Sequence, residues 1–169
     1  MLKTIIISEG DPTGIGYEIL EKSKNRLDHF ARSNLIVLAR SQSKITCNAF
    51  NEISLDSLFT KPPRKGLFQL TDSFLKSTGE RNIILGKPNV FSGAVSYQSL
   101  KFAIQIQKRI RGNLITLPLS KEWVIKSGEK NFRGHTEELA KSYKRDTTMM
   151  MSGPSMKVIV LTTHIPLVR

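Results

Sequence analysis

The sequence predicts an α/β protein built on a parallel sheet, and three observations support this. Residues 2–8 form an Ile-rich run that ends at the turn residues Glu9-Gly10-Asp11-Pro12. A segment with apolar residues at near-helical spacing follows, and residues 34–39 then form a second apolar run of strand length. A strand, a loop, a helix and another strand in this order are typical of the units that build parallel sheets.

The helix expected between these two strands carries charged residues between its apolar ones. Four residues mark its apolar side: Leu20, Leu27, Phe30 and Ala31. Residues 41–82 show only weak alternation and contain the breaker Pro62-Pro63, so we predict irregular structure there with one or two short strands.

Six further elements are expected in the rest of the chain. They are a helix, a strand, two helices and two strands, over residues 92–111, 114–117, 121–127, 136–144, 147–151 and 156–162. Gly112 is predicted to stop the first of these helices, whose last turn is basic. Thr136 is the predicted N-cap of the last helix, with Glu137 and Glu138 in its first turn, and Gly153-Pro154-Ser155 form the final turn.

Length and composition predict one α/β region over residues 1–169, with a formal net charge of +12. The longest apolar runs fall short of the roughly 18 residues that a membrane-spanning helix needs, and no secretory signal is recognised. We therefore expect a soluble, cytoplasmic protein. A single cysteine, Cys47, excludes an internal disulfide. The charge is consistent with attraction either to polyanions such as nucleic acid or to small phosphorylated anions.

Three segments that follow predicted strands are candidates for binding, because ligands of open α/β sheets bind beyond the strand ends. Residues 10–16, Gly-Asp-Pro-Thr-Gly-Ile-Gly, form either a ligand loop or a tight turn. In residues 116–121, Thr-Leu-Pro-Leu-Ser-Lys, Lys121 is either a phosphate contact or a solvated charge. In residues 162–167, Thr-Thr-His-Ile-Pro-Leu, His164 is either a ligand of a divalent metal or a structural side chain. His135, beside a predicted helix start, either binds a polar ligand or is a capping or surface side chain.

Taken in order, these segments resemble one family. The three segments, together with Gly134-His135-Thr136-Glu137 and Met149-Met150-Met151, are similar to 4-hydroxythreonine-4-phosphate dehydrogenase of pyridoxal phosphate synthesis. The resemblance spans almost the whole chain. It implies an isocitrate/isopropylmalate-dehydrogenase-like α/β fold, of which this chain is the N-terminal portion, and a homodimer with its active site at the subunit interface.

The resemblance also implies a reaction and residue roles. The family oxidises a secondary alcohol with NAD, and the resulting β-keto acid loses carbon dioxide. His135 and Thr136 correspond to residues that contact the phosphorylated substrate. His164 corresponds to one of three ligands of a divalent metal, which is zinc, magnesium or cobalt. No catalytic residue is assigned in this chain.

Members of the family are about twice as long as this chain. The other metal ligands and the NAD site are expected in the half that is absent, so we expect this chain to be inactive alone. Leu117 and Tyr17 also depart from the small residue and the Pro usual at their positions.

Two alternatives remain. One is a related dehydrogenase of a phosphorylated sugar acid such as threonate or erythronate phosphate. The other is a basic, non-catalytic nucleic-acid-binding module. Because the basic residues are scattered among acidic ones and no binding motif is present, we expect no nucleic-acid partner. The short apolar runs predict no membrane partner.

Overall fold

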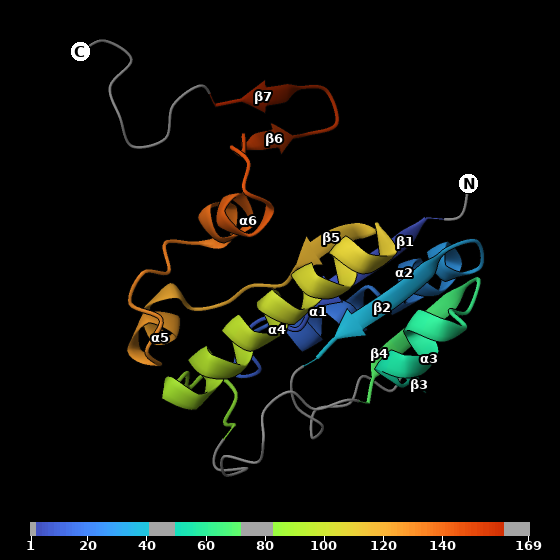
Figure 1. The fold of residues 1–169 in the computed structure, drawn as a ribbon, viewed down its shortest axis with the longest axis horizontal. Helices are drawn as coiled ribbons and strands as arrows, with labels where there is room; N and C mark the ends of the chain where they lie inside the picture. The colour runs from blue at the N-terminus through green and yellow to red at the C-terminus, as the bar shows by residue number, and fades with distance from the viewer. Residues whose placement is uncertain (1–2, 41–49, 72–82, 161–169) are drawn as a thin grey trace. The chain divides into compact units, whose positions relative to one another are not determined.

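The computed structural model describes residues 3–40, 50–71 and 83–160. The chain divides into two compact units, Met1–Phe132 and Arg133–Arg169, which are described here separately (Figure 1). The expectation of a single region over residues 1–169 therefore stays a prediction.

The first unit is built on a five-stranded sheet in which every strand pair is parallel. Its strands, in chain order, are β1 (Thr4–Ser8), β2 (Leu35–Ala39), β3 (Asn51–Ile53), β4 (Gly66–Leu70) and β5 (Asn113–Thr116). They are arranged in the order β3-β4-β2-β1-β5. The predicted strands over residues 2–8, 34–39 and 114–117 are confirmed, and so is the parallel α/β architecture.

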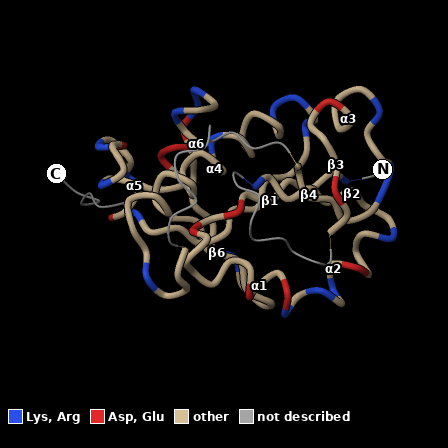
Figure 2. Tube along the Cα trace, turned by 90° about the horizontal axis from the view of Figure 1, so that it is seen from below, with Lys and Arg blue, Asp and Glu red and all other residues tan. Residues whose placement is uncertain are grey.

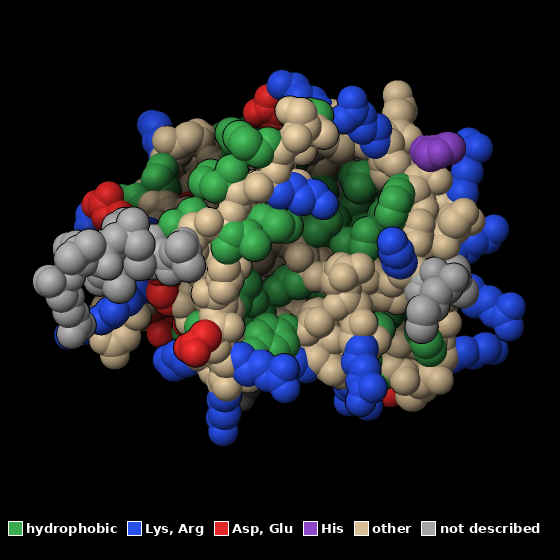
Figure 3. All heavy atoms as spheres, turned by 90° about the horizontal axis from the view of Figure 1, so that it is seen from above, with side chains coloured by type: hydrophobic (Ala, Val, Ile, Leu, Met, Phe, Trp, Pro, Cys, Tyr) green, Lys and Arg blue, Asp and Glu red, His purple; other side chains and the backbone are tan. Residues whose placement is uncertain are grey.

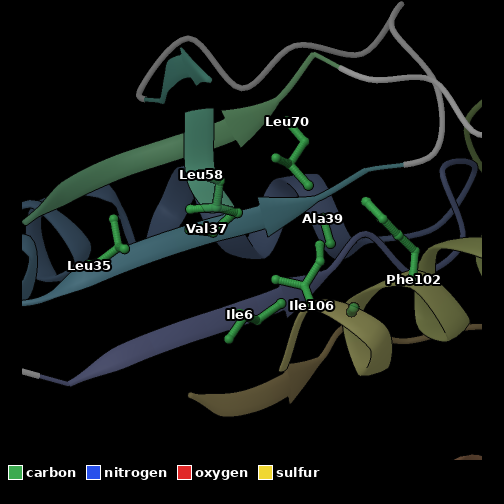
Figure 4. Packing of buried hydrophobic residues seen from close by; sticks show 9 residues of the cluster. Ile6, Leu35, Val37, Ala39, Leu58, Leu70, Phe102 and Ile106 are labelled. Atoms are coloured by element: carbon green, nitrogen blue, oxygen red, sulfur yellow. The ribbon is translucent and has the colours of Figure 1, made fainter. Parts of the chain in front are cut away.

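Helices cover both faces of this sheet. They are α1 (Gly16–Lys22), α2 (Lys24–Ala31), α3 (Leu55–Thr60) and α4 (Val90–Ile110), and α5 (Lys121–Lys126) packs against α4. In Figure 1, α4 lies in front of the sheet and α1 and α2 lie behind it. The face under α3 and α4 holds one buried cluster, shown in Figure 4: Ile6, Leu35, Val37, Ala39, Leu58, Leu70, Phe102, Ala103 and Ile106.

The opposite face packs a second cluster against α1 and α2. Its members are Ile7, Leu20, Ala31, Ile36, Leu38, Phe50, Leu67 and Leu117. Successive residues of β2 alternate between the two clusters, because side chains of a strand point to opposite faces. Both faces are therefore buried, as parallel sheets require.

The first predicted helix is wrong in one respect, since the structure has two short helices that meet at Ser23. The break shifts the buried side, so that Phe30 is 44% exposed although it was expected on the apolar face. A helix was also missed within residues 41–82. Ser54 caps α3 by accepting a hydrogen bond from the Ser57 backbone N–H at 3.2 Å, and Pro62-Pro63 then follow it.

The long helix α4 confirms the prediction over residues 92–111, with a different stop. Asn89 and Ser92 form a capping box at its start. Arg111, with φ 58°, ends the helix instead of Gly112. Gly112 is needed for another reason, because a Cβ there would lie 2.8 Å from the Thr4 carbonyl oxygen of the neighbouring strand.

The second unit contains α6 (His135–Tyr143) and a hairpin of β6 (Met150–Ser152) and β7 (Lys157–Ile159). Gly134 is the N-cap of α6, so the prediction of Thr136 as N-cap is wrong, while Glu137 and Glu138 do lie in the first turn. The Gly153 N–H donates to the Met156 carbonyl at 2.8 Å, which confirms the predicted final turn. Among the helices of the described ranges, none has the length and apolar character to cross a membrane.

Candidate functional site

The order of the strands identifies one edge of the sheet as a candidate site. From β1 the chain passes through α1 and α2 to β2 on one side, whereas α4 returns it to β5 on the other side of β1. The direction of winding therefore reverses between β1 and β5. In open α/β sheets, ligands bind beyond the carboxyl ends of the strands at this reversal. Two loops of this chain lie there, residues 9–15 and residues 117–120.

These two loops are held directly against each other. The Asp11 backbone N–H donates to the Pro118 carbonyl at 2.8 Å. Gly10 has φ +69°, and a Cβ at this position would lie 2.4 Å from the same carbonyl oxygen. Glycine is therefore required both by the backbone conformation and by the approach of the second loop.

Asp11 fixes the first loop from within. This residue is 4% exposed, and its Oδ1 accepts from the Thr13 backbone N–H at 2.9 Å and from the Thr13 hydroxyl at 2.7 Å. Its Oδ2 accepts from the Ser92 hydroxyl at 3.3 Å, which connects the loop to the start of α4. The Asp11 carboxylate is thus a positioning group, since both of its oxygens are used inside the protein.

Glu9 is anchored in a similar way. Its Oε1 accepts a hydrogen bond from the Tyr17 hydroxyl at 2.8 Å. Tyr17, which stands where Pro is usual in the family that the sequence resembles, therefore helps to hold the loop. The Glu9 backbone N–H donates to the Ser99 hydroxyl oxygen at 2.7 Å, and that hydroxyl donates to the Ala39 carbonyl at 2.7 Å. One buried serine of α4 therefore joins the ends of two neighbouring strands.

Leu117 occupies the space between the loops. It is buried, and a Cβ on Gly16 would lie 3.3 Å from its Cδ1. Leu117 is larger than the residue usual at this position, and Gly16 opposite it leaves the space that its side chain needs.

The sequence predicted residues 10–16 and 116–121 as candidate segments, but it did not predict Ser92 and Ser99. These two serines belong to no motif and contact the loops only in the folded chain.

The predicted substrate residues belong to the second unit. His135 and Thr136 are the first two residues of α6, and both are half-buried. The Nε2 of His135 is buried and has no hydrogen-bond partner within the described part of the chain. Burial lowers the pKa of His135, which favours the neutral imidazole. The structure brings these two residues together with each other, as neighbours at the start of one helix.

The other predicted residues have different outcomes. Lys121 is exposed at the first residue of α5. His164, with the rest of residues 162–167, lies outside the described residues, as does Cys47. In residues 3–40, 50–71 and 83–160, no group of three or more His, Cys, Asp or Glu side chains is placed to hold a metal ion.

Comparison with known proteins agrees with the fold and with the resemblance. The family model described as pyridoxal phosphate biosynthetic protein PdxA matches residues 25–169. A 4-hydroxythreonine-4-phosphate dehydrogenase from Aquifex aeolicus is 34% identical, over 99% of this chain and 51% of its own length. A D-threonate 4-phosphate dehydrogenase from Salmonella typhimurium is 30% identical, over 98% of this chain and 52% of its own length.

Solved structures show the same fold. A 4-hydroxythreonine-4-phosphate dehydrogenase from Burkholderia phymatum gives a TM-score of 0.70 at 24% identity, covering 98% of this chain and 51% of that chain. A structure from Salmonella typhimurium gives 0.76 at 26% identity, covering 99% and 53%. The isocitrate/isopropylmalate-dehydrogenase-like fold is confirmed, and the chain spans about half the length of the curated relatives it matches. The chain belongs to the PdxA family of pyridoxal phosphate biosynthetic proteins.

Proposed function

We propose that this chain provides the amino-terminal half of a dehydrogenase that oxidises a secondary alcohol of a phosphorylated hydroxy acid. The observation that carries the proposal is the match to dehydrogenases along 98–99% of the chain. The named relatives act on 4-hydroxythreonine 4-phosphate or on D-threonate 4-phosphate. The first substrate is our primary proposal, with oxidation followed by decarboxylation in pyridoxal phosphate synthesis, and the second is the alternative.

His135 and Thr136 are the residues we assign to substrate binding. The position of His135 at a helix start, the buried unpartnered Nε2 and the lowered pKa all support a neutral imidazole that exchanges one hydrogen bond with a polar substrate. In the first unit, the loop of residues 9–15 is a separate candidate for ligand binding, and Asp11 sets its shape.

NAD is the proposed cofactor, and it would accept the hydride from the alcohol carbon. A divalent metal is also proposed, with His164 as a ligand. The described residues offer no further cluster of ligands, so they do not by themselves form a metal centre, and no step is assigned to the metal here. The remaining ligands and the NAD site are expected from the half of the relatives that this chain does not match.

A homodimer in the cytoplasm is the proposed state of the full-length protein. Exposed hydrophobic side chains (green) are visible on the face drawn in Figure 3. The hairpin supplies several exposed hydrophobic residues, each at least 39% exposed: Met149, Met150, Met151, Met156, Val158 and Ile159. An isolated two-stranded hairpin is marginally stable in water, so an apolar one favours association with another surface.

Joining this chain to the unmatched half of the Aquifex aeolicus relative tests the proposed function. We expect the fusion to form NADH from 4-hydroxythreonine 4-phosphate when zinc or magnesium is supplied, and the chain alone to form none. H135N should abolish most of this activity, whereas H29N, which alters an exposed helix histidine, should not. Faster turnover of D-threonate 4-phosphate would favour the alternative substrate. A well-folded fusion that oxidises neither compound would contradict the proposal, and turnover by the chain alone would contradict its expected inactivity.

A further inference from the structure

A group of basic residues lies at the opposite edge of the sheet from the candidate site. Because all strand pairs are parallel, the amino ends of the strands meet at one edge. The residues just before β1, β2, β4 and β5 are Lys3, 32–34, 61–65 and 111–112. Six of these eleven residues are Lys or Arg and none is Asp or Glu, against 26 basic residues among 169 in the whole chain.

We call these six residues the basic edge: Lys3, Arg32, Lys61, Arg64, Lys65 and Arg111. All six are exposed. None forms an ion pair with another residue in the described ranges. Figure 2 shows Lys and Arg segments (blue) at the end of the sheet near the N-terminus.

Strand pairing arranges the basic edge as a row. Leu35 pairs with Thr4 on one side and with Gly66 on the other, and Ile5 pairs with Asn113. The basic residues preceding these positions therefore lie on consecutive strands. Since neighbouring strands are about 4.8 Å apart, the row from Lys65 to Arg111 extends over about 14 Å. The basic edge and the candidate site lie at opposite ends of β1. Because β1 has five residues, about 16 Å separates them.

We propose that the basic edge binds the phosphate backbone of nucleic acid without reading its sequence. A row of Lys and Arg side chains that form no ion pair within the described ranges suits successive phosphate oxygens. The eleven residues contain no aromatic side chain for base stacking and no large apolar side chain to anchor a protein partner or to enter a bilayer. The expectation of no nucleic-acid partner depended on the scattering of charge along the chain, whereas the parallel sheet gathers part of that charge at one place.

Salt dependence of binding tests this proposal independently of catalysis. The probe is a fluorescent random-sequence DNA duplex of about 20 base pairs, titrated with the full chain at several salt concentrations. The test variant combines K3Q, R32Q and K65Q, and the control combines K130Q, R145Q and K157Q, which are exposed residues that do not belong to the basic edge. Each variant lowers the net charge of +12 by three, and circular dichroism checks that both are folded.

We expect the test variant to lose about 2.7 from the slope of log K against log salt, at about 0.9 for each phosphate contact, and at least about tenfold in affinity at low salt. The control should keep the wild-type slope. Equal losses in both variants would show that only overall charge matters and would overturn the proposal. So would failure of the wild-type chain to bind DNA at low salt, or stronger binding to phosphatidylserine vesicles than to DNA.

Discussion

The contact between the two loops of the candidate site predicts a large effect of Gly10→Ala. An L-residue in the left-handed region costs about 1–2 kcal/mol. In addition, the new Cβ would lie 2.4 Å from the Pro118 carbonyl oxygen and 2.9 Å from the Leu117 carbonyl carbon, so the backbone must move. That movement breaks the 2.8 Å hydrogen bond from the Asp11 N–H, and a buried donor without a partner costs about 1–3 kcal/mol.

Gly86→Ala is the matched control for this substitution. Gly86 has φ +75°, close to the +69° of Gly10, but a Cβ there would meet no atom of the described residues within 4 Å. The two variants therefore share the conformational cost and differ in the contact with the second loop. We expect Gly10→Ala to be less stable than Gly86→Ala by about 1–3 kcal/mol.

Thermal unfolding followed by circular dichroism measures this difference. At about 3 °C for each kcal/mol in a chain of this size, Gly10→Ala should melt about 3–9 °C below Gly86→Ala. Urea unfolding should give the same order with unchanged m-values. If the two variants melted at the same temperature, the close approach of residues 9–15 to Pro118 would not be needed for stability, and our account of Gly10 would be wrong.

Three further substitutions test other parts of the structure. Ser99→Ala removes the hydroxyl that joins the Glu9 N–H to the Ala39 carbonyl, and we expect a loss of about 2–4 kcal/mol in urea unfolding. Asn89→Ala removes the capping box of α4 and should cost about 1 kcal/mol in the same assay, whereas an unchanged stability would contradict the cap. Burial lowers the pKa of His135 below its usual 6.5, so the unfolded chain binds the proton more readily and His135 stabilises the fold fully only above that pH. Stability should fall as the pH drops below about 6.5, and H135Q should make this fall shallower in melts across that range.

The fold could be predicted where the signal is local. The apolar runs of β1 and β2 and the long periodic segment of α4 each lie within one stretch of chain, and all three were found. The break between two helices at Ser23 was not predicted, because the apolar spacing of residues 20–31 fits one helix nearly as well as two. The short helix α3 was missed because its six residues present too little periodicity, although Ser54 is a standard N-cap residue.

The candidate site was predicted only in part, for a similar reason. The glycine-rich segment of residues 10–16 stands out in the sequence, so the loop itself was found. The residues that hydrogen-bond to this loop were not predicted, because Ser92 lies 81 residues from Asp11 and Ser99 lies 90 residues from Glu9. A buried hydroxyl that bonds two distant backbone groups has no sequence pattern of its own.

The sequence by itself determined the class of this protein, through local alternation of strands and helices and through five motifs in a specific order. The tertiary structure decided which of those segments come into contact. Parallel pairing places the loops after β1 and β5 side by side and presses Gly10 against Pro118. The same pairing brings Lys3, Lys65 and Arg111 to the opposite edge, although they are far apart in the chain. Local patterns record the preference of each segment, whereas only the register between strands fixes which distant residues meet.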